Sequence, residues 1–393
     1  MSLETLLAEL LADRESVHMR SEGEFDRVAA PFERRVVIFG TGYLGDMALA
    51  GLRGAGIEPV AFCDNNSRRW YSQKEGIAIL SPAEAVERYG ESAAFVVAIY
   101  NSSAARSQLH RLGCSRVVPY PALFWKHWRT MPREDRLELP SRVLEQAGEM
   151  PAGYDLLSDE ESRREFCAQI RWRCLLDYDC LPPASDAREM YFEPAIFRLL
   201  EQEVFVDCGA FDGDSIRAFL GAASGRFGKV YAWEADRANC AALCRYRASL
   251  PEEIASRMEI LPYAVGQRNG AVRFISEGTA GSRLTDAGHA LEVECRTIDS
   301  ALADVRPSLI KMDIEGAEPD ALRGAAGTMA RCRPVMAVCA YHKLAHLWEI
   351  PRLLKSANQD YRIFLRRYAE ECWETVYYAV PPERLASAEA LHS

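Results

Sequence analysis

Apolar and polar positions along the chain predict an alternation of buried strands and amphipathic helices. In the first half, short apolar runs predict strands at residues 35–39, 59–63, 94–99 and 116–119. In the second half, similar runs predict seven strands, at residues 204–208, 229–233, 259–265, 309–313, 335–340, 361–367 and 375–380. Segments with apolar residues at helical spacing lie between most of them. Strands that alternate with helices are typical of α/β proteins with a parallel sheet.

Two parts of the second half depart from this alternation. Only a loop separates residues 361–367 from 375–380, and apolar residues alternate in both, which is typical of an antiparallel hairpin at a sheet edge. An insertion at residues 270–296 is also predicted to be hairpin-like. Ser282 and Arg283 within it are candidates to shape a ligand pocket.

The pattern predicts two Rossmann-like domains joined by a helical linker. The boundaries that we expect are a helical segment at residues 1–30, a first α/β domain at 31–125, the linker at 126–195 and a second α/β domain at 196–393. Within the linker, Ser158 and Glu161 have the spacing of a capping box, which predicts a helix that bridges the two halves.

Charge and composition narrow the expected partners and location. The chain has 57 Asp and Glu against 47 Lys and Arg, a formal net charge of -10, so we expect no nucleic acid and no membrane surface as partner. It has no apolar run of about 18 residues and no signal-peptide pattern near its start. The 12 cysteines lack zinc-site spacing and predict reduced, packed thiols in a cytoplasmic protein. Whether the chain forms a homo-oligomer stays open.

A glycine-rich turn follows the first strand of the N-terminal domain. Gly40, Gly42 and Gly45 have the GxGxxG spacing between a strand and a helix, and Asp64 ends the next strand. Such glycines let the backbone approach a phosphate at a helix N-terminus, and the carboxylate binds ribose hydroxyls. A tight turn without a ligand is the alternative interpretation.

The residues after this turn favour a nucleotide-sugar over hydride chemistry. Asp64-Asn65-Asn66, with Gly76-Ile77 and the sequence SPAE at 81–84, resembles the small Rossmann-like domain that precedes bacterial sugar acetyltransferases. This resemblance implies a nucleotide or nucleotide-sugar as the ligand of the N-terminal domain. No catalytic acid for a dehydrogenase is evident there.

A second turn, at residues 204–214, combines glycines with acidic side chains. Phe211 stands where a third, phosphate-facing glycine would lie, so this turn suits an adenosine ligand with a cationic, amino-acid-like tail. We expect Glu234, at the end of the next strand, to bind the ribose hydroxyls and Asp207 to meet the ammonium group. The full set of predicted cofactor residues is Asp207, Gly209, Ala210, Gly213, Glu234, Tyr263 and Ala264.

Four blocks of sequence carry a family resemblance in this half: FVDCGAFDGDS at 205–215, YAWEAD at 231–236, LIKMDIEGAEPDALRG at 309–324 and AYHKLAHLWEIPRLL at 340–354. They resemble the FkbM family of S-adenosylmethionine-dependent methyltransferases. The resemblance implies the class I methyltransferase fold, a doubly wound seven-stranded sheet. It also implies O-methylation (EC 2.1.1.-) of a hydroxyl on a small molecule or glycan, such as a sugar or secondary metabolite. One departure is Ala235, where the family often has proline.

The end of the strand at 309–313 offers groups for acid–base chemistry. A hydroxyl needs a base or a metal to lose its proton. Lys311 and Asp313 lie on the same side of this strand, whose carboxyl end is expected to face the ligand crevice. Asp313 is our leading candidate for general base or substrate clamp. His342 is the alternative base, because imidazole titrates near neutral pH, or else it makes a structural hydrogen bond.

A divalent metal and two other functions stay open. His342 and His346 would form a metal pair with Asp313 if helical, and Asp313 with Glu315 would suit magnesium, but no HExxH motif is present and we assign no ligand. The other functions are an NAD-dependent sugar oxidoreductase that uses the N-terminal domain, and a non-catalytic nucleotide-binding scaffold.

Overall fold

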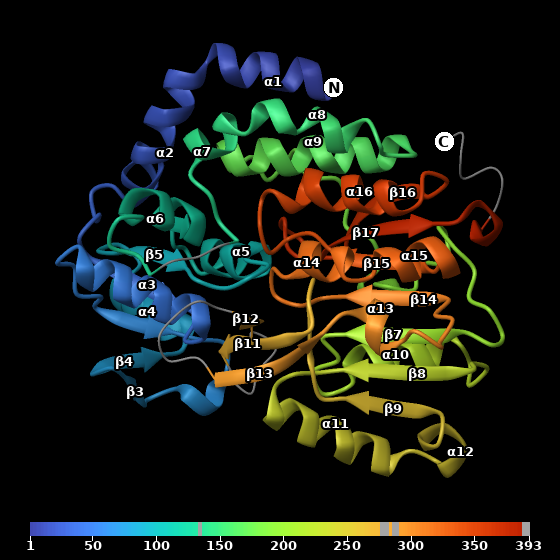
Figure 1. Cartoon of the computed structure of the whole chain (residues 1–393). Coiled ribbons are helices and arrows are strands. Elements are labelled where there is room, and N and C mark those ends of the chain that lie inside the picture. Colours follow the sequence, from blue (N-terminus) through green and yellow to red (C-terminus); the bar gives the residue numbers. More distant parts are fainter. Residues whose placement is uncertain (133–135, 276–282, 285–290, 387–393) are drawn as a thin grey trace. The chain divides into compact units, whose positions relative to one another are not determined.

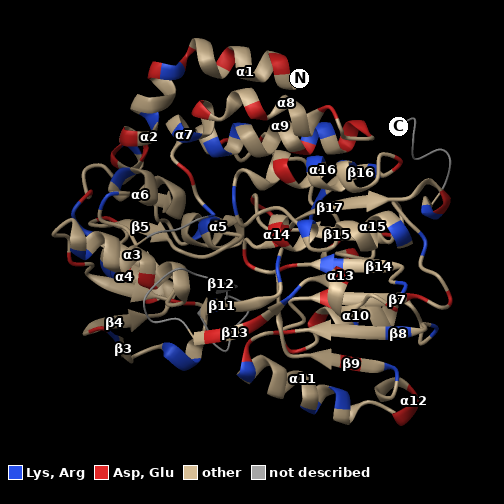
Figure 2. Ribbon diagram, viewed as in Figure 1, with Lys and Arg blue, Asp and Glu red and all other residues tan. Residues whose placement is uncertain are grey.

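The computed structural model describes residues 1–132, 136–275, 283–284 and 291–386 (Figure 1). The chain divides into two compact units. The first comprises Met1–Gly148, Cys167–Pro183 and Ala369–Trp373, and the second Glu149–Phe166, Ala184–Tyr368 and Glu374–Ser393. Of the helices in the described ranges, none is both long and apolar enough to cross a membrane. In Figure 2, acidic and basic residues alternate along the helices instead of gathering by sign.

The first unit is built on a six-stranded sheet with the order β3-β4-β2-β1-β5-β6. The strands are β1 (Val36–Phe39), β2 (Ala61–Cys63), β3 (Gln73–Lys74), β4 (Ile77–Leu80), β5 (Ala94–Val97) and β6 (Val117–Pro119). All neighbours pair in parallel except β3 with β4. The four predicted strands are present as β1, β2, β5 and β6. The pattern missed β3 and β4. β3 has only two residues and therefore shows no period.

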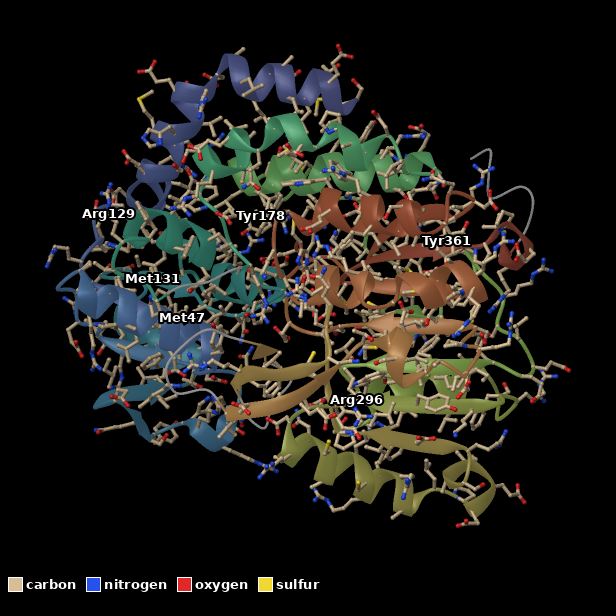
Figure 3. The ribbon with its side chains drawn as sticks, viewed as in Figure 1. Met47, Arg129, Met131, Tyr178, Arg296 and Tyr361 are labelled. Carbon is tan, nitrogen blue, oxygen red and sulfur yellow. The ribbon has the colours of Figure 1, made fainter. Side chains whose placement is uncertain are left out.

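Helices cover both faces of this sheet. They are α1 (Leu3–Ala12), α2 (Arg14–Ala29), α3 (Tyr43–Gly54), α4 (Pro82–Tyr89), α5 (Ser103–Arg111), α6 (Tyr120–His127) and α7 (Pro140–Glu145). One face packs against apolar residues of α2, α3 and α6, and the other against α4 and α5. Within the first packing, Gly51 of α3 leaves room for Met131, whose Sδ would lie 1.8 Å from an added Cβ (Figure 3).

The second unit is built on a seven-stranded sheet with the order β16-β17-β15-β14-β7-β8-β9. The strands are β7 (Val204–Cys208), β8 (Lys229–Trp233), β9 (Met258–Leu261), β14 (Leu309–Met312), β15 (Val335–Cys339), β16 (Arg362–Arg367) and β17 (Thr375–Val380). Only β17 runs against its neighbours, so the predicted antiparallel edge hairpin is confirmed. This is the predicted seven-stranded α/β sheet.

The predicted strand at 259–265 is divided between two sheets. Its first part is β9, and its end is β10 (Ala264–Val265), which joins a four-stranded sheet of order β10-β13-β11-β12. In this sheet β11 (Gly270–Ile275) pairs antiparallel with both β12 (Arg283–Leu284) and β13 (Leu291–Arg296), the hairpin-like insertion that the sequence predicts. Ser282 lies outside the described residues, and only the backbone of Arg283 is described, as part of β12.

The helices of the second unit begin with α8 (Pro151–Tyr154). Those that follow the strands are α10 (Asp214–Ala222), α11 (Arg237–Ser249), α12 (Glu252–Ala255), α13 (Ile298–Ala301), α14 (Glu318–Arg323), α15 (Ala326–Cys332) and α16 (His346–Ala357). The helix predicted near Ser158 is α9 (Glu160–Leu175). Its capping carboxylate is Asp159, which accepts from Ser162 N at 2.9 Å, whereas Ser158 Oγ accepts from Ile363 N in β16. The capping-box prediction was therefore wrong by one residue.

The loop between β16 and β17 belongs to the first unit. Ala369, Cys372 and Trp373 lie in the apolar core of that unit, and Glu371 accepts hydrogen bonds from the backbone and hydroxyl of Ser102. The chain returns to the second unit at Glu374.

Candidate active site

A cavity of about 270 Å³ lies in the second unit, at the carboxyl ends of β7, β8 and β14. The chain continues from β7 to β8 on one side, and β14 pairs with β7 on the other. The turn that follows β7 therefore leads away from the turn that follows β14. Parallel sheets form ligand crevices at such a point, between two diverging turns. Five acidic side chains and one basic side chain line the cavity: Asp214, Glu234, Asp313, Glu315, Glu374 and Lys311.

Glu234 lies in the cavity wall with its carboxylate fixed by the backbone. Its Oε2 accepts from Phe211 N at 2.9 Å, and its Oε1 accepts from Asp236 N at 2.7 Å. Each oxygen keeps a second lone pair for a ligand hydroxyl. Burial raises the pKa of Glu234 to about 7, against the two backbone hydrogen bonds, which lower it. The residue lies where the sequence predicted it.

Backbone conformation and close packing exclude a side chain at the two glycines of the second turn. Gly209 and Gly213 have φ of +80° and +92°, which disfavours any side chain. A Cβ on Gly209 would lie 2.0 Å from Asp313 O, and one on Gly213 would lie 2.7 Å from the Tyr246 ring. Gly209 also lines the cavity, whereas Gly213 and the buried Ala210 do not.

Asp207 is buried beneath this turn and does not line the cavity. Its Oδ1 lies 3.0 Å from Lys311 Nζ, and its Oδ2 accepts from the hydroxyl of Ser215. Its contact with a ligand ammonium group stays a prediction, because the structure gives its carboxylate partners within the protein.

Lys311 lines the cavity, but its ammonium group already contacts Asp207 and Gly209. Its Nζ donates to Gly209 O at 2.8 Å. Burial alone would lower the pKa of Lys311, but the carboxylates of Asp207 and Asp313 raise it above its usual value. A lysine held in its charged form positions the Gly209 turn and offers no lone pair for catalysis.

Tyr263 and Ala264 form a further wall of the cavity, and their predicted contact with an adenine stays a prediction. The guanidinium of Arg296 lies over the Tyr263 ring, with Cζ 4.0 Å from the ring centroid (Figure 3). This cation–π contact fixes the aromatic ring from outside the cavity.

Asp313 lies at the other end of the cavity, immediately after β14. Tyr191 donates its hydroxyl to Oδ2 at 2.9 Å, and Tyr341 donates to Oδ1 at 3.2 Å. Burial raises the pKa of both phenols, so both keep their protons as donors. The carboxylate is thereby oriented at the cavity surface, where the sequence placed its candidate base or clamp.

His342 is buried behind Asp313, 3% exposed, and does not line the cavity. Its Nδ1 lies 3.0 Å from Glu318 Oε1, and its Nε2 lies 3.5 Å from Asp313 Oδ1. Burial lowers its pKa, but the carboxylates of Glu318 and Glu315 outweigh burial and raise the pKa of His342 to about 10. An imidazole that already carries its proton at neutral pH is a poor base, so the geometry favours the structural alternative.

Three polar residues of the cavity wall that interact with Asp313 were not among the predicted site residues. Tyr191 comes from the predicted linker, Tyr341 from the end of β15, and Glu374 from the loop before β17. Glu374 has a φ of +49°, and burial with the nearby Asp313 raises its pKa to about 7. Only Tyr341, beside the candidate His342, had a signal in the sequence that would have found it.

One group of side chains in the described ranges has metal-ligand spacing. Ligand atoms of Asp313, Glu318 and His342 all lie within 4.8 Å of one another. Glu318 was not among the predicted ligands. The predicted partner His346 contacts Glu318 instead, with Nδ1 3.5 Å from Oε2.

The glycine turn of the first unit is closed by Asp64. This carboxylate accepts from Thr41 N at 3.0 Å, from the Thr41 hydroxyl and from Asn66 N at 2.8 Å. A Cβ on Gly40 or Gly45 would lie within 2.5 Å of another residue, whereas Gly42 faces open space.

A second cavity, of about 420 Å³, lies beside this turn rather than at it. Its wall includes Asn65, Trp70, Gln108 and Arg111, but none of the predicted glycines and not Asp64. A nucleotide in the first unit therefore stays a prediction.

Comparison with known proteins gives a family match for part of the second unit. Residues 207–369 match the model of the methyltransferase FkbM domain. This part of the second unit is therefore similar to an FkbM methyltransferase domain. The matched range contains Asp207, Glu234, Asp313 and His342, while Tyr191 and Glu374 of the cavity wall lie outside it.

One solved structure shares the fold. The crystal structure of methyltransferase FkbM from Methylobacillus flagellatus KT has a TM-score of 0.76 at 21% identity, over 96% of this chain and 98% of that chain. Two others are too distant to bear on the argument. They are precorrin-6y C5,15-methyltransferase from Geobacter metallireducens GS-15 (TM-score 0.28, 14% identity, 47% of this chain and 83% of that chain) and a fibrillarin/Nop5p complex (TM-score 0.29, 11% identity, 47% and 74%). Comparison with curated proteins gave no match.

Proposed function

We propose that the chain is an S-adenosylmethionine-dependent O-methyltransferase whose acceptor is a hydroxyl of a small molecule or glycan, such as a sugar or secondary metabolite. The observation that carries the proposal is one cavity with a ribose-type carboxylate, Glu234, at one end and an oriented carboxylate, Asp313, at the other. The match to the FkbM methyltransferase domain supports methyl transfer as the reaction.

The residues present fit S-adenosylmethionine. The free lone pairs of Glu234 suit the two ribose hydroxyls, and Tyr263 with Ala264 suits the adenine. The acidic wall suits a cation, because its one lysine is already paired with Asp207. When bound, S-adenosylmethionine supplies a methyl group activated by its sulfonium.

Asp313 is the proposed contact for the acceptor hydroxyl. Its carboxylate is held by Tyr191 and Tyr341, so a hydroxyl that donates to it is oriented as well. The same carboxylate can take the proton that the hydroxyl loses as its oxygen bonds to the methyl carbon. Clamp and base are then one residue.

A nucleotide or nucleotide-sugar is the proposed ligand of the first unit. Gly42, which faces open space, and the cavity beside Trp70 support it. The NAD-dependent alternative is less favoured, because no catalytic acid for a dehydrogenase is evident in the sequence of this unit. Among the described residues, the structure pairs none of the 12 cysteines in a disulfide, which is in keeping with the cytoplasmic location that we propose.

The test is calorimetry on the full chain with S-adenosylhomocysteine, the demethylated product, and with NAD in a parallel titration. We expect heat from the first ligand only, and at least about tenfold weaker binding in Glu234→Gln. Glu259→Gln is the matched control, because Glu259 is exposed and pairs with Lys229. Absence of heat from S-adenosylhomocysteine contradicts the proposal, and heat from NAD favours the oxidoreductase.

A further inference from the structure

Buried polar atoms without hydrogen bonds gather behind the acceptor end of the cavity. In the part of the chain that the structure describes, Glu318 Oε2, both ring nitrogens of His342 and His346 Nδ1 make no hydrogen bond of acceptable geometry. The three residues are at most 3% exposed. Buried polar groups are almost always hydrogen-bonded, so four such atoms in one cluster indicate a binding partner such as an ion.

The spacing of the cluster fits a metal ion. Ligand atoms of Asp313, Glu318 and His342 lie within 4.8 Å of one another. Nitrogen and oxygen ligands at about 2.0–2.2 Å from a central ion lie roughly 3 to 4.4 Å from each other. An imidazole binds an ion through one ring nitrogen, and His342 Nδ1 lies 3.0 Å from Glu318 Oε1, within that range.

The fold presents these side chains to one point from two neighbouring strands. β14 ends before Asp313, and a turn through Glu315 and Gly316, with φ of +55° and +99°, brings back Glu318 at the start of α14. Glu318 Oε1 accepts from Ile314 N at 2.9 Å, which orients its carboxylate. His342 follows β15, the parallel neighbour of β14.

We propose that Asp313, Glu318 and His342 bind a divalent transition-metal ion. One imidazole nitrogen with two carboxylates favours Mn²⁺, Fe²⁺ or Zn²⁺ over Mg²⁺ and Ca²⁺, which prefer oxygen ligands alone. Two carboxylates and a neutral imidazole balance the charge of such an ion. Asp313 also lines the cavity, so the ion lies beside the space for the acceptor, where a Lewis acid would favour loss of a hydroxyl proton. That last role rests on the proposed function, but binding of the ion does not.

The rival arrangement fills the same space without a metal. A protonated His342 between Glu318 and Asp313 would balance part of the negative charge by itself. The two arrangements differ in one observable, because only the first retains an ion through purification or takes one up afterwards.

The experiment measures metal, not activity. The full chain is purified without chelator and its metal content is measured by plasma mass spectrometry. The chain is then stripped with chelator and titrated with Mn²⁺, while electron paramagnetic resonance follows the free ion. We expect one Mn²⁺ per chain, and binding about 100-fold weaker in Asp313→Asn and in Glu318→Gln. Asp320→Asn is the matched control, because Asp320 lies on the same helix and its exposed carboxylate pairs with Arg323.

Two results would overturn the proposed metal site. A chain that is purified without metal and binds no Mn²⁺ at millimolar concentration overturns the proposal, as does equal binding by wild type and both variants. Glu318 also supports its loop, so circular dichroism checks that each variant is folded, and Asp313→Asn tests the site if Glu318→Gln unfolds. Heat from S-adenosylhomocysteine is measured on the same samples, so failure of the metal site is separable from failure of the proposed function.

Discussion

Asp207 and Lys311 are register partners on the paired strands β7 and β14, and their side chains form a buried ion pair at 3.0 Å. The pair joins the two strands directly beneath the cavity, and Lys311 extends the link to the carbonyl of Gly209. Its partners make it a structural support of the site.

Breaking this pair should destabilise the fold. Lys311→Met leaves the Asp207 carboxylate buried without its cation, which costs about 3–5 kcal/mol. Urea unfolding followed by circular dichroism measures the loss. The double variant Asp207→Asn with Lys311→Met should recover part of it, because no charge is then left buried. A wild-type unfolding midpoint for Lys311→Met would contradict the role given to the pair.

Asp313→Asn should separate cofactor binding from turnover. The amide keeps the size of the side chain but cannot take a proton, so methyl transfer should fall roughly 100- to 10,000-fold. S-adenosylhomocysteine affinity should stay within about threefold, because the ribose contact lies at Glu234. The measurement is transfer of labelled methyl from S-adenosylmethionine to a panel of sugars and glycans.

Tyr191→Phe is the companion variant. It removes one of the two hydroxyls that orient Asp313 and keeps the carboxylate. We expect a loss of about tenfold in kcat, between wild type and Asp313→Asn. Wild-type turnover in Asp313→Asn on a true acceptor would show that this carboxylate is neither base nor clamp.

Affinity for S-adenosylhomocysteine should depend on pH through Glu234. Burial raises its pKa to about 7, and ribose hydroxyls donate better to the ionised form, so binding lowers that pKa. Affinity is therefore highest above pH 7 and falls by up to about tenfold per pH unit below it. Calorimetry between about pH 5.5 and about pH 8, a range that spans the pKa of Glu234, measures how the affinity changes with pH.

The slope has its own controls. Glu234→Gln should bind weakly and without this dependence. Glu374, whose pKa is also about 7, lies in the same wall, so Glu374→Gln shows how much of the slope belongs to it. A slope that is unchanged in Glu234→Gln would place the titrating group elsewhere.

Substitution by alanine should destabilise the protein at Gly209 but have little effect at Gly42. Gly209→Ala needs a φ near +80° and puts Cβ 2.0 Å from Asp313 O, so it should lower the free energy of unfolding by more than about 2 kcal/mol. Gly42 has a φ of -87° and open space around it, so Gly42→Ala should change stability by less than about 1 kcal/mol. Thermal unfolding compares the two. A stable Gly209→Ala would mean that the turn relaxes.

The sequence predicted the strands and the main acids of the site because both are local signals. Buried parallel strands read as apolar runs, and acids that follow them lie at one edge of the sheet. Glu234 and Asp313 were found in this way, and both line the cavity.

Contacts between distant segments could not be predicted. From the sequence, Asp207 was predicted to contact the cofactor. Its partner Lys311 lies beside it only because of the register of β7 with β14, which the sequence does not show. Tyr191 lies in a segment with no regular pattern, and Glu374 follows a hairpin loop whose path depends on both units. The cap at Asp159 differs from the predicted Ser158 because Ser158 pairs with β16, which no local rule encodes.

The loop between β16 and β17 limits how the chain can be cut. A single peptide bond separates Trp373, buried in the core of the first unit, from Glu374 in the cavity wall. A fragment that starts at the family boundary would keep this loop and lose the neighbours that shield Trp373 and Cys372 from water. It would then expose apolar side chains next to the wall of its own cavity. We therefore expect the second half of the chain to aggregate when it is expressed alone. Work on inhibitors or variants should use the intact chain.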